Sequence, residues 1–502
     1  MTATAAPATT PAAPTEGQHL GATLFLSCLA QFMVILDVSV VNVALPAIRG
    51  GLHFTEVDLQ WVVNAYTVTF AGFLLLGGRA ADLLGRRRVF VGGLLLFALA
   101  SLAGGIADSQ AVLIGARALQ GLGGAVIAPA SLSILTTTFA EGPARNRAVG
   151  IWGAMGGAGG AAGVLLGGIL TSALSWRWIL FINVPIGVLA AVFAQRLIAE
   201  TRGATRARRD FDLRGALAAT GGLTLLVLGI VRTDVTGWGS AQTLALIGAG
   251  LVLLAAFLVV EGRFARAPLM PLRIYASRTL SAANVVVLLV GGATFGMWFF
   301  VSLYLQQVLG YSPIKAGLAF LPMTLCIVVG STLASRIVQR VGVKPLLVVG
   351  MTLLTIGLVL FGNVATHGTY LGDMLVPSLL VAMGIGLSFV PATIAAVSGV
   401  APAEAGLASG LVNTARLVGG ALGLAVLAAI ATAQTKSDLR TGTASAHAAL
   451  TSGFQLAFVI AAGFALAGGL VALFGLPRIV PRRTAAHGVS PGAQTASAKS
   501  SA

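Results

Sequence analysis

The sequence predicts an all-α polytopic membrane protein with fourteen spanning helices, two six-helix halves and two further helices between them. The first observation is the composition: the 502-residue chain is 57% hydrophobic and only 9% charged, with a mean hydropathy of +0.94. A soluble domain carries about 25% charged residues. The second is that the apolar residues gather in runs of the roughly 20 residues that a bilayer crossing needs. The third is that the basic residues favour every second loop.

Each expected span is an apolar run bounded by polar, basic or Gly/Pro-containing residues. An even number of spans places both termini on the same side of the membrane. The expected spans, in chain order, are 21–45, 61–78, 89–107, 111–138, 148–173, 178–198, 214–232, 241–260, 281–303, 316–335, 345–364, 371–398, 405–433 and 453–476. The Ala/Thr/Pro-rich stretch 1–20 and the stretch 477–502 are expected to be disordered cytoplasmic tails, because they lack the apolar residues that a packed core needs.

The distribution of Lys and Arg predicts the orientation. Of the 31 basic residues, 23 fall in the tails and loops on the side of the termini, six in the opposite loops and two, Arg117 and Arg416, inside spans. Cytoplasmic loops carry the excess of Lys and Arg, so both termini are expected in the cytoplasm of a multi-pass plasma-membrane protein. The net charge of +16 therefore reflects topology, and we expect no nucleic-acid partner.

A weak internal repeat predicts the division into halves. The loop GRAADLLGRRR at 78–88 is matched by SRIVQRVGVK at 335–344, and the two loops are equivalent if two extra spans separate the halves. Repeated halves around a central cavity are typical of transporters. The expected units are a six-helix half at 21–198, a linker with two additional spans at 199–260, and a second six-helix half at 261–476.

Several motifs resemble those of one family, in order and on the expected spans. GRAADLLGRRR resembles the loop motif of the major facilitator superfamily, and LIGARALQGLGGA at 113–125 resembles its fourth-span motif. The first-span stretch LDVSVVNVALP at 36–46 resembles that of the fourteen-span drug:proton antiporter branch, a group of multidrug efflux transporters. Further stretches similar to that branch are WRWILFINVPIG at 176–187, YLQQVLGYSPIKAGLAFLP at 304–322 and GLASGLVNTARLVGGALG at 406–423.

The resemblance implies a fold, a function and a gating loop. It implies a proton-coupled antiporter that exports drugs, antibiotics or other amphiphiles by alternating access, with two halves rocking around a central cavity. It implies gating roles for Gly78, Asp82, Gly85 and Arg86, where Asp82 and Arg86 latch the halves. We also expect the Asp82 carboxylate to interact with the N-terminus of the third span, where a negative charge is stabilised.

The fifth span departs from the family pattern. The antiporter motif of the family carries a Gly-Pro pair, whereas Val164 follows Gly163 in this chain. Gly159, Gly163 and Gly167 remain, four residues apart on one helical face, which allows a neighbouring helix to approach closely. We therefore expect these glycines to serve helix packing.

Asp37 is the candidate proton carrier, because the other 14 acidic residues all lie in tails, loops or span ends. A buried carboxylate is costly, at roughly +2.5 to +3.5 kcal/mol in the bilayer centre. Counted from the span ends, Asp37 and Arg117 lie at similar depth, so they are expected to pair and to face one cavity. The arginine favours the ionised carboxylate and burial favours the neutral acid, so such a group can load and release a proton. A purely structural ion pair is the alternative.

Other polar residues in the spans are candidates for the substrate cavity: Gln31, Asn42, Tyr66, Gln120, Asn413 and Arg416. Each one singly could instead form an interhelical hydrogen bond, worth on the order of 0.6 kcal/mol. The spans hold two deep arginines, Arg117 and Arg416, and one deep aspartate, Asp37, so the expected cavity has no surplus of negative charge. The hypothesis is that neutral, zwitterionic or anionic amphiphiles suit the cavity better than dications.

Two alternatives to a drug exporter are considered. A uniporter or importer of a metabolite or nutrient would have the same fold. A membrane-embedded enzyme is a remote alternative, for which the only signal is the acidic pair Asp210 and Asp212, a D-x-D pattern of the kind that binds metal–nucleotide sugars. We expect no enzymatic activity, no metal and no cofactor, with the proton gradient as energy source, and a monomer whose partners are an amphiphilic small molecule, protons and the lipid bilayer.

Overall fold

The computed structural model describes residues 20–140, 143–201, 212–264, 268–398, 400, 405–441 and 445–477. The expected tails, apart from Leu20 and Pro477, and most of the linker before residue 212 lie outside these residues. Within the described residues there are no strands. The α-helices are α1 (Leu20–Leu52), α2 (Glu56–Leu59), α3 (Trp61–Leu84), α4 (Arg86–Gly105), α5 (Gln110–Thr138), α6 (Pro143–Ala173), α7 (Trp178–Phe181), α8 (Asn183–Leu197), α9 (Leu213–Thr236), α10 (Ala241–Val259), α11 (Arg278–Leu303), α12 (Pro313–Val341), α13 (Val343–Phe361), α14 (Leu375–Val397), α15 (Ala405–Arg440) and α16 (Ala446–Gly475).

The predicted all-α membrane fold is confirmed. The described residues contain fourteen helical segments that are long and apolar enough to cross a membrane, one for each predicted span. The short helices α2 and α7 extend the spans of α3 and α8. Helix α1 runs seven residues beyond its predicted end at residue 45, because Pro46 is accommodated inside the helix rather than ending it.

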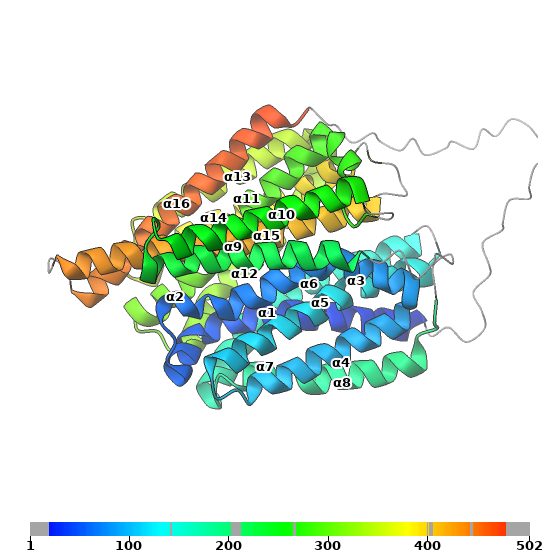
Figure 1. Ribbon diagram of the computed structural model, residues 1–502, viewed down its shortest axis with the longest axis horizontal. Coiled ribbons are helices and arrows are strands. Elements are labelled where there is room, and N and C mark those ends of the chain that lie inside the picture. The colour runs from blue at the N-terminus through cyan, green and yellow to red at the C-terminus, as the bar shows by residue number, and fades with distance from the viewer. Residues whose placement is uncertain are drawn as a thin grey trace, which may run out of the picture.

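The helices run roughly parallel in one bundle (Figure 1). Helices α1 to α8 form one half and α11 to α16 the other, and the halves meet where α6 packs against α12 and α3 against α15. We call the end with the turn at Gly85 and the loop 268–277 the basic end. The loops at 53–55, 106–109 and 174–177 lie at the opposite end.

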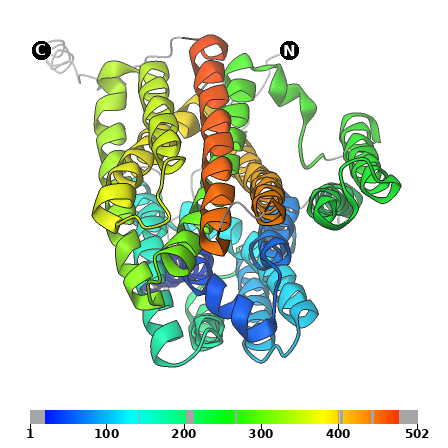
Figure 2. The ribbon, with the colours of Figure 1, turned by 90° about the vertical axis from the view of Figure 1, so that its left-hand side faces the viewer.

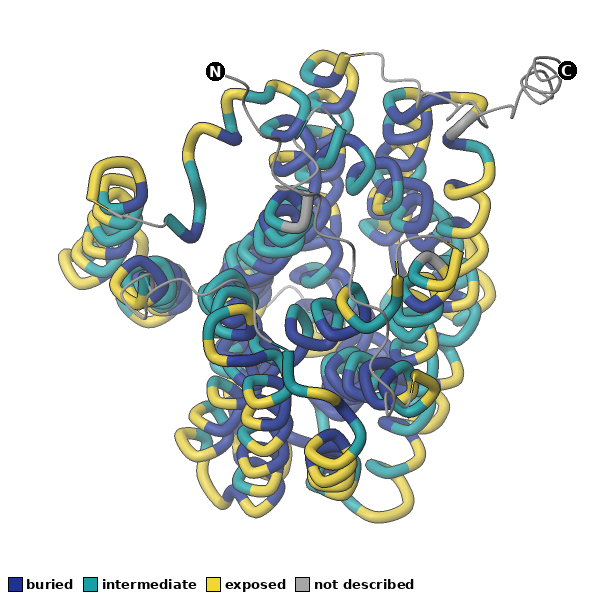
Figure 3. The backbone as a smooth tube through the Cα atoms, turned by 90° about the vertical axis from the view of Figure 1, so that its right-hand side faces the viewer, coloured by how far each residue is buried: buried dark blue, intermediate teal, exposed yellow. Residues whose placement is uncertain are grey.

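The two additional helices stand beside this bundle. Helix α9 packs against α3 and α15, whereas α10 packs mainly against α9 (Figure 2). Exposed residues cover much of this pair and the outer faces of the bundle (Figure 3). The exposed residues include large apolar side chains such as Phe25, Leu99 and Val252, each more than 60% exposed. An apolar exterior of this kind is what a lipid-facing surface requires.

Candidate functional site

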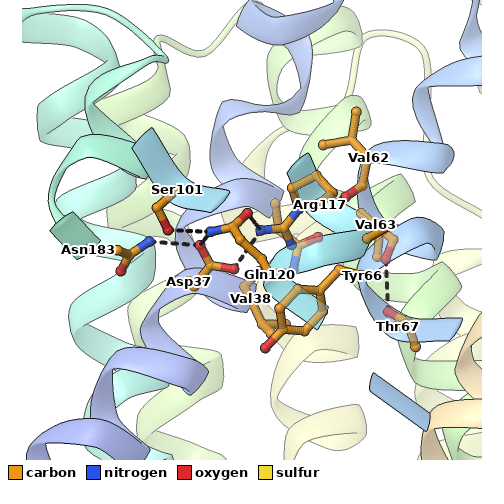
Figure 4. A network of polar contacts seen from close by, with 12 residues as sticks. Asp37, Val38, Val62, Val63, Tyr66, Thr67, Ser101, Arg117, Gln120 and Asn183 are labelled. Carbon is orange, nitrogen blue, oxygen red and sulfur yellow. Dashed lines mark hydrogen bonds and ion pairs between the residues drawn. The ribbon is translucent and has the colours of Figure 1, made fainter. Parts of the chain in front are cut away.

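Asp37 and Arg117 form an ion pair in the interior of the N-terminal half. Arg117 Nη1 donates to Asp37 Oδ2 at 2.5 Å, and the two side chains are 2% and 0% exposed (Figure 4). Asp37 comes from α1 and Arg117 from α5. The predicted pairing of the deep acid with the deep base is therefore present.

Neutral side chains complete the coordination of the carboxylate. Asp37 Oδ1 accepts hydrogen bonds from Gln120 Nε2 at 3.1 Å and from Asn183 Nδ2 at 2.8 Å. Gln120 Nε2 also donates to Ser101 Oγ at 2.6 Å. Ser101 belongs to α4 and Asn183 to α8, so both helices contribute to the network. Asn183 lies in the family-like stretch WRWILFINVPIG, which does not by itself indicate this role, and the sequence gives no signal for Ser101.

The guanidinium has further partners of its own. Arg117 Nε donates to the Val62 carbonyl at 2.9 Å and Nη1 donates to Gln120 Oε1 at 2.8 Å. Its carbon Cζ lies 4.5 Å from the ring centre of Tyr66, a cation–π contact. A buried ion pair is tolerated when further hydrogen bonds stabilise both groups, and both groups have such bonds here.

A central cavity of about 1850 Å³ separates the two halves. Its lining runs from Asn42, Val63 and Trp298 in the middle of the bundle to Arg79 and Asp82 at the basic end. No residue from the opposite-end loops 53–55, 106–109 or 174–177 lines it. The described conformation is therefore accessible from the basic end.

The opposite end is closed by contacts between the halves. Pro46 has no backbone N–H, so the carbonyl of Asn42, four residues earlier in α1, loses its helical partner. Ser302 Oγ on α11 donates to that carbonyl at 2.5 Å, and Gln306 Nε2 donates to the Val43 carbonyl at 2.9 Å. Pro46 of the first-span motif thus leaves the Asn42 carbonyl free to accept a hydrogen bond that links the two halves.

The ion pair lies outside this cavity, which corrects one expectation. Neither Asp37 nor Arg117 lines the cavity, and Gln120, a cavity candidate, does not line it either, because its amide is bound in the Asp37 network. Tyr66 lines the cavity and contacts Arg117 through its ring, so it stands between the pair and the cavity. The other candidates, namely Gln31, Asn42, Asn413 and Arg416, line the cavity as well.

The predicted gating loop forms the turn between α3 and α4. Arg86 Nη2 donates to Asp82 Oδ1 at 2.9 Å within this half, and Gly78, Asp82 and Arg86 line the cavity near the basic end. Arg86 is the first residue of α4, so Asp82, in the last turn of α3, contacts the N-terminus of α4 through this side chain. The backbone N–H groups of Arg87 and Arg88 at that N-terminus donate instead to the carboxylate of Glu200, at 3.2 Å each.

Gly85 is required by this turn. Its φ of +109° is a backbone conformation that other residues rarely adopt, and an added Cβ would lie 2.6 Å from Glu200 Oε1. We expect Gly85→Ala to destabilise the protein by about 1–3 kcal/mol, the usual cost of a strained backbone conformation. Thermal unfolding of the purified protein, followed by intrinsic fluorescence, measures the effect.

Gly92→Ala is the matched control for this prediction. Gly92 lies in the same helix, α4, and no atom lies within 4 Å of a Cβ added there. This variant should unfold at or slightly above the wild-type temperature, because alanine favours a helix. Equal unfolding temperatures for Gly85→Ala and Gly92→Ala would contradict the assignment.

The fifth-span glycines lie against α1. A Cβ added at Gly159, Gly163 or Gly167 would lie 2.9 Å or less from Phe32 O, Ser39 Cβ and Val40 O respectively. Helix α6 is continuous across Gly163–Val164, where the antiporter motif of the family has a proline. These contacts are those of close helix packing.

The described residues contain no cluster of His, Cys, Asp and Glu that could hold a metal ion. Of the D-x-D pair, Asp210 lies outside the described residues. Asp212 caps α9, where its Oδ1 accepts from the Gly215 N–H at 2.8 Å. The acidic residue of this pair that the structure describes therefore has a helix-capping position.

Two halves around a cavity that reaches one end, together with the two additional helices α9 and α10, make up fourteen segments long enough to span a membrane and define a multi-pass membrane transporter. The chain belongs to the Major Facilitator Superfamily, whose model matches residues 27–424 and, in an overlapping match, 283–499.

Curated relatives and solved structures are similar to this chain. Cephamycin export protein CmcT of Amycolatopsis lactamdurans is 46% identical over 445 residues, which are 88% of this chain and 90% of the relative. Puromycin resistance protein pur8 of Streptomyces alboniger is 41% identical over 443 residues, 87% of each chain. The crystal structure of a bacterial homolog of the human lysosomal transporter Spinster, inward-facing and unoccupied, has a TM-score of 0.65 at 16% identity, covering 91% of this chain and 96% of that one.

Proposed function

We propose that this protein exports amphiphilic small molecules from the cell in exchange for protons. The observation that carries the proposal is the buried Asp37–Arg117 pair, since Asp37 is the one acid deep within a described span. The printed functions of two relatives, cephamycin export and puromycin resistance, support the export of antibiotics or similar compounds. The cavity supports one binding site that faces the two sides in turn.

The basic end is the cytoplasmic end in this proposal. The positive-inside rule places the arginine-rich loops and both termini there, in the plasma membrane. The described conformation is then inward-facing, and cargo enters from the cytoplasm or the inner leaflet. The protein acts as a monomer, needs no cofactor beyond the proton gradient and catalyses no covalent reaction.

The exchange follows from the chemistry of the network. When the halves rock and the opposite end opens, water from outside reaches Asp37, and a proton on Oδ2 replaces the ionic hydrogen bond from Arg117. The pair weakens, the hydrogen bonds of Gln120 and Asn183 rearrange, and the inward-facing conformation returns after cargo has left. The proton then leaves to the cytoplasm as the pair re-forms. Asp82 and Arg86 act at the cytoplasmic end by latching the halves while the cavity faces outward.

Expression in an efflux-deficient bacterial strain tests the proposal. A panel of neutral, anionic and cationic antibiotics and dyes is scored for growth inhibition, with and without a proton uncoupler. We expect raised resistance to a subset of the compounds and lower intracellular accumulation, both abolished by the uncoupler. Resistance that persists without a proton gradient would contradict coupling, and increased accumulation would indicate an importer.

A further inference from the structure

Arg416 is a cation deep in the cavity wall that has no acidic partner among the described residues. Its Nε and Nη2 donate to the same atom, Asn413 Oδ1, at 3.3 and 3.0 Å. None of the five ion pairs among the described residues includes Arg416. A guanidinium has five N–H donors, and these two bonds leave the others without a partner in the described part of the chain.

Helix packing prevents Arg416 from turning away from the cavity. Helix α15 is pressed against α11 through glycines, and a Cβ added at Gly291 would lie 2.1 Å from the Arg416 carbonyl oxygen. Similarly, a Cβ at Gly419 would lie 1.9 Å from the Leu288 carbonyl. Since the backbone at Arg416 and at Gly419, about one turn later, contacts α11 this closely, α15 keeps one face toward the cavity. The side chain leaves from that face.

The charges around the cavity favour an anion. The charged residues that line it are four arginines and one acid: Arg79, Arg86, Arg273, Arg416 and Asp82. The single acid lies near the basic end, is 54% exposed on its side chain and is already paired with Arg86. Asp37 lies outside the cavity behind Tyr66. Apart from Asp82 near the basic end, the described lining residues offer a cation no carboxylate, whereas an anion deep in the cavity would find Arg416.

We propose that Arg416, oriented by Asn413, is a subsite for the anionic group of an amphiphilic cargo, a carboxylate or a sulfonate. This inference rests on the proposed function and names its substrate class. Arginine and an oxyanion form paired, charge-assisted hydrogen bonds, which are among the strongest in proteins. The aromatic rings of Phe295 and Trp298 line the same cavity, and Phe295 lies 5.8 Å from the Arg416 Cζ. These rings accommodate the apolar body of the cargo.

Two dyes that share one scaffold test the subsite. 8-Anilinonaphthalene-1-sulfonate is an anion, and N-phenyl-1-naphthylamine is the same scaffold without the sulfonate. Equilibrium dialysis measures their binding to the purified full-length protein in nanodiscs of phosphatidylcholine, which carries no net charge, with empty nanodiscs subtracted. The variants are Arg416→Gln and, as a matched control, Arg340→Gln, the same change at an exposed arginine of α12 that does not line the cavity.

We expect the wild-type protein to bind the sulfonate at least roughly tenfold more tightly than the neutral dye, which corresponds to about 1.4 kcal/mol. Arg416→Gln should lose that preference and keep the affinity for the neutral dye, and Arg340→Gln should bind both dyes as the wild type does. Wild-type protein that binds the two dyes equally, or neither, overturns the proposal. So does an Arg416→Gln variant that retains the preference. If Arg416→Gln does not purify in folded form, the wild-type comparison of the two dyes alone decides.

Failure of this inference is distinguishable from failure of the proposed function. Dye binding at equilibrium needs neither a proton gradient nor transport. Loss of the anion preference leaves proton-coupled export standing, and absence of export with the preference intact leaves the subsite standing.

Discussion

Asp37→Asn is expected to reduce proton-driven efflux to the level of membranes that lack the protein. Asparagine has nearly the same shape as aspartate and can still accept hydrogen bonds from Gln120 and Asn183, but it cannot take up a proton or carry a charge. Arg117 keeps its bonds to the Val62 carbonyl and to Gln120. The Arg117 guanidinium loses its anion, which costs stability in a buried site. We therefore expect the variant still to insert in the membrane, with a lower unfolding temperature, while losing coupling.

Inverted vesicles or proteoliposomes with an imposed pH gradient provide the measurement. Two quantities are followed, the uptake of a transported compound and the proton flux that this compound triggers. Asp108→Asn is the matched control, because Asp108 is an exposed acid in the loop between α4 and α5 at the opposite end. It should couple as the wild type does. Uphill transport by Asp37→Asn would refute the assignment of Asp37 as proton carrier.

Arg117→Gln should destabilise the protein strongly, by about 3–5 kcal/mol, the range found when one partner of a buried ion pair is removed. The Asp37 side chain is fully buried, so its carboxylate would lose its cation in a site that water does not reach in the described conformation. The amides of Gln120 and Asn183 cannot neutralise it. The unfolding temperature and the yield of monodisperse protein measure the loss.

The double variant Asp37→Asn/Arg117→Gln separates stability from coupling. It removes both charges, so we expect it to recover most of the unfolding temperature that Arg117→Gln loses, while efflux stays absent. A double variant as unstable as Arg117→Gln would show that the guanidinium acts through its contacts with Val62 and Tyr66 rather than through its charge. This cycle also measures the interaction energy of the pair directly.

The sequence predicts the membrane fold well because the bilayer imposes a strong and local signal. Every span is a run of about 20 apolar residues, and fourteen such runs are visible without tertiary information. The pairing of Asp37 with Arg117 is also predictable, because charges in the bilayer are rare and depth can be counted from the span ends. Both predictions depend on properties along the helix axis.

What the sequence leaves open depends on rotation about the helix axes and on distant contacts. Asn183 and Ser101 are neutral side chains of ordinary types, and only the rotation of α8 and α4 directs them to Asp37. The rotation of α5 likewise directs Gln120 to Asp37 rather than to the cavity, which the sequence alone does not show. Glu200 caps α4 from 112 residues away, so no local pattern around Gly85 reveals it. The bond from Ser302 to the carbonyl freed by Pro46 likewise joins different halves of the chain.

The position of Tyr66 has a consequence for the variety of cargo. Its ring contacts Arg117 on one side and the cavity on the other, so a molecule bound in the cavity would touch the tyrosine rather than the Asp37 carboxylate. If Asp37 carries the proton as proposed, exchange would depend on which way the two halves are tilted and not on the chemical identity of the cargo. Two exported compounds as different as a sugar conjugate and a fused-ring aromatic should then be exchanged for the same number of hydrogen ions per molecule.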